Sequence, residues 1–174
     1  MVSLHDAAGE GKVEVLQLIL ERGADINSRD ANANNGTPLH IASEQGNIDV
    51  VCLLVERGAE VDPRDKLGYT PLHLASLQGH LEVSRILVNR SANVNARGAR
   101  HYTPLMLSAG YGHLGTVKLL LEHGADINAR SDRGETPYQM SQYSGIREII
   151  NLLRERSAGM TRFDEIPLWF KCNF

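Results

Sequence analysis

The chain has 174 residues, which is long enough for one domain with a buried core. Its formal net charge of −3 argues against a nucleic-acid-binding protein, because such a protein is expected to have a basic face. No apolar run approaches the ~18–20 residues that a membrane span needs, and the first three residues open no basic-then-apolar signal sequence. The two cysteines, Cys52 and Cys172, show no metal-ligand spacing, so we expect a reduced, cytoplasmic protein, with the nucleus as the alternative location.

One motif recurs along the chain and sets the order of the predicted elements. Thr-Pro-Leu-His starts at Thr37 and again at Thr70, and shortened copies start at Thr103 and Thr136, each 33 residues after the last. An upstream copy begins at Leu4 without the Thr-Pro pair, and the turn-rich loop 31–35 absorbs two extra residues before the next copy. This period predicts five repeats, with approximate bounds 2–28, 29–61, 62–94, 95–127 and 128–158.

Each repeat predicts two short helices and a turn. Threonine caps the start of the first helix and proline fits its first turn, so the third repeat has a predicted helix from Pro71 to Leu77. Gly79 then ends this helix, because glycine adopts a left-handed conformation most easily. The second helix carries apolar residues at helical spacing, as at Leu114, Val117 and Leu120. The stretch up to the next Thr-Pro pair predicts a turn that projects from the helices.

The fifth repeat differs from the inner ones at positions that would face a further repeat. Arg147 and Arg154 stand where the inner repeats carry apolar residues such as Leu114 and Leu121. Because a helix pair in such an array buries its apolar faces against its neighbours, charge at these positions predicts a terminating cap. We therefore expect the stack to end near Ser157.

The motif Gly-x-Thr-Pro-Leu-His-x-Ala, with Gly-Ala-Asp-Ile-Asn closing the unit, resembles the ankyrin repeat family over roughly residues 2–158. The resemblance implies an all-α ankyrin-repeat solenoid: five stacked helix-turn-helix repeats, short β-hairpin fingers at right angles to them, and a C-terminal tail. It implies that partners bind on the finger tips and on the concave face of the first helices. It also implies that His40 and His73 hydrogen-bond within their turns and link one repeat to the next.

The polar residues offer no pattern for enzyme or metal chemistry. Zinc needs all its ligands within about 2.1 Å, and although His40 and His73 share a repeat position, no third or fourth ligand stands at a matching spacing. No glycine-rich phosphate loop, nucleophile elbow or paired-acid cluster occurs in the sequence. We therefore expect no catalytic residue, no metal site and no cofactor.

Positions that vary between repeats are the candidates for recognition. They are the finger tip, the residue before Thr-Pro, and the two residues before the helix-ending glycine. Four of the five tyrosines fall in this set, and tyrosine and arginine are the residues most enriched at interface hot spots. The candidate partner-binding residues are Lys66, Leu67, Tyr69, Leu77, Gln78, Arg100, His101, Tyr102, Tyr111, Arg133, Glu135 and Tyr143.

Two of these tyrosines have an alternative interpretation, in which Tyr69 and Tyr102 only cover the junction between finger and helix. The fourth finger also departs from the motif, since Gly98 and His101 replace the Asp65 and Gly68 of the finger before it. We expect that finger to be either mobile or specialised for the partner.

The last sixteen residues, 159–174, belong to no repeat and hold all three phenylalanines and the only tryptophan. Large aromatic side chains favour burial, so one interpretation folds this tail back onto the last repeat as an extra cap. The other makes Leu168, Trp169 and Phe170 a short motif that inserts into a second protein.

These features predict a protein–protein interaction module that acts as an adaptor or as an inhibitor masking its partner. The alternative is a structural fragment of a larger ankyrin-containing protein whose activity lies elsewhere. We expect another protein as the partner, no nucleic acid, no membrane, and a monomeric chain.

Overall fold

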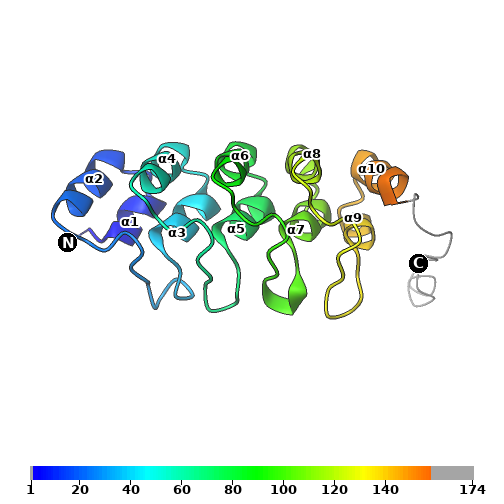
Figure 1. Ribbon diagram of the computed structural model, residues 1–174, viewed down its shortest axis with the longest axis horizontal. Helices are drawn as coiled ribbons and strands as arrows, with labels where there is room; N and C mark the ends of the chain where they lie inside the picture. Colours follow the sequence, from blue (N-terminus) through cyan, green and yellow to red (C-terminus); the bar gives the residue numbers. More distant parts are fainter. Residues whose placement is uncertain (1, 158–174) are drawn as a thin grey trace.

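The computed structural model describes residues 2–157, and within them ten α-helices follow one another in pairs. Figure 1 shows the first helices of the pairs in one row, the second helices in a parallel row, and loops projecting from the side of the first row. The described residues therefore form a helical solenoid, as predicted. The helices are α1 (Leu4–Gly9), α2 (Val13–Glu21), α3 (Pro38–Gln45), α4 (Ile48–Glu56), α5 (Pro71–Gln78), α6 (Leu81–Asn89), α7 (Pro104–Gly110), α8 (Leu114–Glu122), α9 (Pro137–Ser144) and α10 (Arg147–Ser157).

The ends of the first helices follow the motif. In α5, Thr70 precedes the helix in an extended conformation, Pro71 occupies the first turn, and Gly79 ends it with a φ of 77°. Threonine and proline open α3, α7 and α9 in the same way. After the second helix α6, Ser91 adopts a φ of 64° where the equivalent residue of the neighbouring repeats is a glycine. The predicted capping and stop signals are thus confirmed, although Ser91 holds its stop position with a strained backbone.

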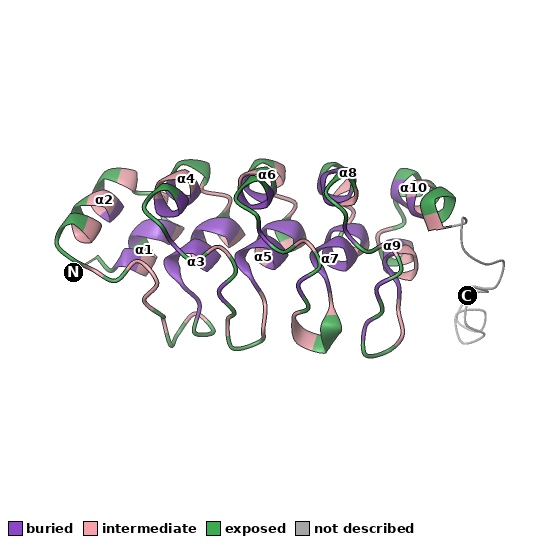
Figure 2. Cartoon of the chain, in the orientation of Figure 1, coloured by how far each residue is buried: buried purple, intermediate pink, exposed green. Residues whose placement is uncertain are grey.

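The core runs along the stack between the two rows of helices. Leu39, Leu72 and Leu105 point into it from the first helices, and Leu87 and Leu120 from the second, each at most 1% exposed. Figure 2 shows that the first helices are mostly buried, whereas the second helices keep an exposed outer side. Each buried leucine contributes roughly 1.5–3 kcal/mol relative to an exposed one, so the packing between neighbouring pairs dominates the stability of the stack.

The last helix pair has a polar outer side. Ile149 and Leu153 of α10 are fully buried, whereas Arg147 and Arg154 on the same helix are exposed. This exposure is the arrangement expected if the arginines keep the outer side of the fifth repeat in contact with water.

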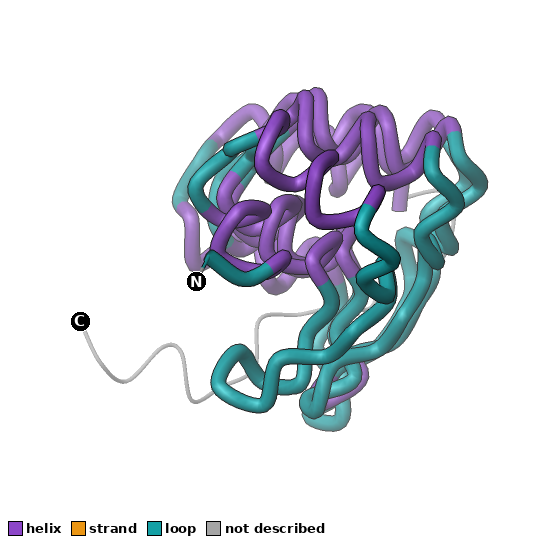
Figure 3. The backbone as a smooth tube through the Cα atoms, turned by 90° about the vertical axis from the view of Figure 1, so that its left-hand side faces the viewer, coloured by secondary structure: helices purple, strands orange, loops and turns teal. Residues whose placement is uncertain are grey.

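In the described residues the fingers contain no β-strand, unlike the β-hairpins that the resemblance implied, and the finger of the fourth repeat contains a short 3-10 turn, Ala99–His101. Each is closed by a backbone hydrogen bond between its first and last residues, and only finger 2 forms an isolated β-bridge, between Asp30 and Gly36. So few residues between these ends leave no length for a ladder of strand hydrogen bonds. We name them finger 2 (residues 30–36), finger 3 (65–69), finger 4 (98–102) and finger 5 (131–135); Figure 3 shows them projecting together below the two layers of helices.

Residues 158–174 lie outside the described part of the chain. The two interpretations of the tail, including the motif at Leu168, Trp169 and Phe170, therefore remain untested predictions. Among the described helices, none combines the length and the apolar character needed to cross a membrane.

Candidate partner-binding surface

Two buried histidines attach the fingers to the helices. The Thr70 backbone N–H donates to Nδ1 of His73 (3.1 Å), so the ring proton lies on Nε2, which donates to the Tyr102 carbonyl of finger 4 (3.0 Å). His40 makes the same contacts one repeat earlier and donates to the Tyr69 carbonyl of finger 3 (3.0 Å). Each histidine thereby links its own repeat to the next finger, which confirms the role implied by the resemblance.

Burial holds these two rings in the neutral form. Desolvation lowers the pKa of His73 from 6.5 to about 4, against an opposing contribution from its hydrogen bond to the Tyr102 carbonyl. Desolvation also lowers the pKa of His40. A neutral ring is the form that these contacts require, because Nδ1 must accept a hydrogen bond while Nε2 donates one.

Two further histidines join the turns between the paired helices. His80 donates from Nε2 to the Glu44 carbonyl of the preceding repeat (2.9 Å), and His113 donates to the Leu77 carbonyl (2.9 Å). The rings lie so close to the preceding turn that a Cβ on Gly79 would stand 2.3 Å from His113. Glycine is therefore required there both for its left-handed backbone and for the space it leaves.

An arginine ladder connects the bases of the first fingers. The Arg29 guanidinium donates to the Arg64 carbonyl (2.7 Å), and the Arg64 guanidinium donates to the Arg97 carbonyl (2.7 Å) and to that of Gly68 (3.0 Å). These contacts hold neighbouring fingers side by side. The fingers are therefore fixed to one another as well as to the helices.

The junction between the fourth and fifth repeats uses different residues. Met106, which is fully buried, replaces the finger-linking histidine. In its place the Glu135 carboxylate accepts hydrogen bonds from the hydroxyls of Tyr102 (3.3 Å) and Tyr143 (3.0 Å), as well as from Ser131 (3.2 Å). Three of the sequence-predicted site residues, Tyr102, Glu135 and Tyr143, are thus brought together and hold this junction.

Fingers 4 and 5 also touch at their tips. Asp132 lies within ion-pair distance of His101, and its backbone N–H donates to the Arg100 carbonyl (3.0 Å). Asp132 is one of the positions that vary between repeats, although it is not among the twelve candidate partner-binding residues. This contact gives finger 4 a fixed neighbour.

Finger 4 has an unusual backbone. Arg100 and His101 both adopt left-handed conformations, with φ of 55° and 57°, which costs non-glycine residues roughly 1–2 kcal/mol each. Gly98 at the start of the finger leaves room for the ring of Tyr69, which would lie 2.3 Å from a Cβ at that position. The finger has a defined and strained shape, which fits the expectation of a specialised loop better than that of a mobile one.

The predicted site residues divide into two groups by exposure. Among the large apolar and aromatic residues of the site, Tyr111, Tyr143 and Leu67 are the most exposed, at 63%, 53% and 49%. Tyr69, Leu77, Tyr102 and Glu135 are partly buried, whereas Lys66, Gln78, Arg100, His101 and Arg133 are exposed. We call fingers 3 to 5 and the C-terminal ends of α5, α7 and α9 the finger–helix surface.

Tyr69 and Tyr102 fit the alternative interpretation, in which they cover the finger–helix junction. The Tyr69 ring lies 5.3 Å from that of His73, centroid to centroid, and packs over Gly98. Tyr102 packs against Met106 and Met140. Both side chains therefore contribute to the fold as well as to the surface.

Two tyrosine hydroxyls of this surface have shifted pKa values. Burial raises the pKa of the Tyr69 hydroxyl, with smaller contributions from Tyr102, Asp65 and Tyr111, while Arg100 opposes them. Burial, followed by Glu135, raises the pKa of the Tyr143 hydroxyl. Of the tyrosines on this surface, Tyr102 and Tyr143 are joined through Glu135, which accepts a hydrogen bond from each hydroxyl.

The part of the chain that the structure describes holds no group of three or more histidine, cysteine or acidic residues that could bind a metal ion. The histidines at matching repeat positions instead use their ring nitrogens on backbone carbonyls.

Two family models match the chain. One, described as ankyrin repeats (3 copies), matches residues 4–98, and another, described as ankyrin repeats (many copies), matches residues 86–141. A search of the curated proteins found no match. The matched residues include the motif threonines, the finger-linking histidines and the helix-ending glycines Gly46, Gly79 and Gly112.

Proposed function

Because the chain belongs to the ankyrin repeat family, whose members are protein–protein interaction modules, we propose that it binds a partner protein through the finger–helix surface. It acts as an adaptor, or as an inhibitor that covers a functional surface of its partner. Folds of this family are typically non-catalytic scaffolds, and we propose that this chain also works by binding alone.

The observation that carries the proposal is the exposure of large side chains on a rigid support. Tyr111 and Tyr143 are more than half exposed at the ends of α7 and α9, and Leu67 is nearly as exposed at the tip of finger 3. The hydrogen bonds described above hold the fingers in place before any partner arrives. Preorganised aromatic side chains lose little entropy on binding, which is the property that makes tyrosine effective at interfaces.

The test compares two double variants in quantitative affinity capture from extracts of the source cells. Tyr111→Ala/Tyr143→Ala should lower the recovery of the partner by tenfold or more, which corresponds to about 1.4 kcal/mol. Leu18→Ala/Ile48→Ala is the matched control, since both of these apolar residues are exposed on second helices away from the fingers. Equal recovery with the tyrosine variant and the parent would contradict the assignment of the surface.

A second proposal is that the chain is a structural unit of a larger ankyrin-containing protein whose activity lies elsewhere. In that case neither double variant changes what is captured. The same experiment therefore separates the two proposals, provided that both variants keep the thermal stability of the parent.

A further inference from the structure

Fingers 3 to 5 have a net positive charge, whereas the chain as a whole has a net negative charge. With the arginine that precedes each of them, they hold six lysine and arginine residues and three acidic ones, although the whole chain has a net charge of −3. Finger 2, counted in the same way with Arg29, holds one basic and one acidic residue and has no net charge. This net positive charge lies on the repeats that also carry the exposed tyrosines.

All three acidic residues of these fingers are already engaged within the chain. The Asp65 carboxylate accepts hydrogen bonds from the backbone N–H groups of Leu67 and Tyr69, both at 2.8 Å. Asp132 contacts His101, and Glu135 accepts hydrogen bonds from two tyrosines. None of these carboxylates forms an ion pair with a lysine or arginine of the fingers.

The cations at the finger tips have no ion-pair partner among the described residues. Lys66, Arg100 and Arg133 are exposed, and within residues 2–157 none of them forms an ion pair. Arg64 and Arg130 instead use their guanidinium groups on backbone carbonyls of the fingers. The surface therefore presents three exposed cations without an ion-pair partner in the described part of the chain, beside exposed apolar and aromatic side chains.

From this distribution we propose that the finger–helix surface recognises an extended acidic segment of the partner protein. Its carboxylates lie on Lys66, Arg100 and Arg133, and its apolar side chains lie on Leu67, Tyr111 and Tyr143. The inference rests on the proposed function and names the chemical class of its partner. Opposite charge raises the association rate and excludes basic competitors, even where each exposed ion pair adds little affinity.

The repeat spacing also sets the pattern of the acidic segment. Neighbouring helices pack roughly 8–10 Å apart, and an extended chain advances about 3.3 Å per residue. Carboxylates three residues apart along the partner therefore match successive fingers, with apolar residues between them.

The test uses a random library of short peptides displayed on phage and selected on the intact chain. The expected pool is enriched in aspartate and glutamate at a spacing of three residues, with apolar or aromatic residues between. Its peptides should bind the triple variant Lys66→Glu/Arg100→Glu/Arg133→Glu about tenfold more weakly or worse, and their affinity for the parent should fall as salt rises.

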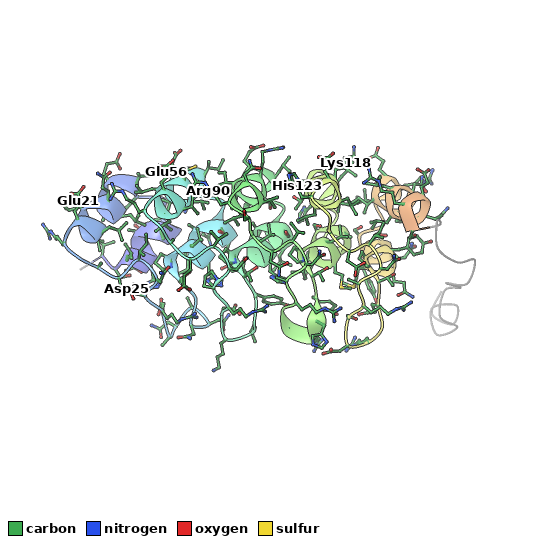
Figure 4. The ribbon with its side chains drawn as sticks, viewed as in Figure 1. Glu21, Asp25, Glu56, Arg90, Lys118 and His123 are labelled. Atoms are coloured by element: carbon green, nitrogen blue, oxygen red, sulfur yellow. The ribbon has the colours of Figure 1, made fainter. Side chains whose placement is uncertain are left out.

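The matched control is Arg57→Glu/Arg90→Glu/Lys118→Glu, which makes the same change in charge at exposed residues that lie in a second helix or directly after one. Figure 4 shows Arg90 and Lys118 in that row, away from the fingers. This variant should bind the selected peptides as the parent does. Equal losses in both triple variants would overturn the proposal, because they would indicate a response to net charge alone.

Other outcomes separate this inference from the proposed function. A neutral or basic pool that loses binding in Tyr111→Ala/Tyr143→Ala overturns the acidic segment and supports the surface. An acidic pool that depends on the three cations but not on the tyrosines supports the acidic segment and contradicts the role of the tyrosines. A pool without any enrichment contradicts both the acidic segment and the assignment of the surface. If a labelled single-stranded oligonucleotide binds more tightly than the peptides, the ligand of this surface is nucleic acid and not an acidic segment.

Discussion

Replacing His73 with glutamine should make the stack less stable at neutral pH and remove part of its sensitivity to acid. Gln139 occupies the same position in the fifth repeat and accepts a hydrogen bond from the Thr136 backbone N–H (2.9 Å), so glutamine preserves the contact at the helix start. The substitution removes the donor to the Tyr102 carbonyl, and leaving such a buried acceptor unpaired costs about 2 kcal/mol.

Acid removes this difference in stability between the parent and His73→Gln. The pKa of His73 is about 4 in the folded chain against 6.5 for an ordinary histidine, so the unfolded chain takes up the proton first as the pH falls. Stability is therefore complete above pH 6.5 and is lost as the pH falls towards the folded pKa. Between about pH 7.5 and about pH 5, this one ring costs the parent about 2 kcal/mol, which His73→Gln avoids.

Urea unfolding followed by circular dichroism at the two pH values measures the effect. The deficit of His73→Gln relative to the parent should shrink from about 2 kcal/mol to near zero at the lower pH. Leu87→Ala is the control, because it removes a fully buried side chain without a titrating group and its deficit should be the same at both values. A His73→Gln deficit that stays constant would refute the argument from burial.

Three further predictions concern single residues and are checked by thermal and urea unfolding. Gly79→Ala should lower the free energy of unfolding clearly more than Gly134→Ala, which should cost about 1 kcal/mol. Both glycines are left-handed, but a Cβ at position 79 would meet the His113 ring, whereas a Cβ at position 134 would meet open space. Equal losses of stability would contradict the close contact at Gly79. Tyr102→Ala should destabilise the chain by about 2 kcal/mol and Tyr111→Ala by less than about 0.5 kcal/mol, because only the first side chain packs against buried methionines; a larger loss at Tyr111 would show a packing role. Ser91→Gly should stabilise the chain by about 0.5–1 kcal/mol by relieving its left-handed backbone, and a loss of stability would show that the serine side chain matters more than the strain.

The helix pairs could be predicted from the sequence because each signal in the repeat is local. Thr70, Pro71 and Gly79 act within one helix, and the period repeats that information along the chain. The role of His73 came from the family resemblance, since its partner, the Tyr102 carbonyl, lies 29 residues further along.

The division within the candidate site could not be predicted in the same way. Tyr69 and Tyr111 are both tyrosines at variable positions, yet one packs over Gly98 and the other is exposed. That difference depends on the path of the following finger, which is set by two left-handed residues of finger 4 that are not glycines. The pairing of Tyr102 with Glu135 likewise depends on how neighbouring repeats stack, because it joins residues 33 positions apart.

The most direct test of the central claim is a photocrosslinking experiment on the bound complex. A benzophenone amino acid replaces Tyr111 in one variant and Leu18 in another, which are both exposed and lie on different faces of the stack. The account predicts that irradiation joins the partner to the chain through position 111 and not through position 18. Crosslinking through position 18 alone would contradict the assignment of binding to the finger–helix surface.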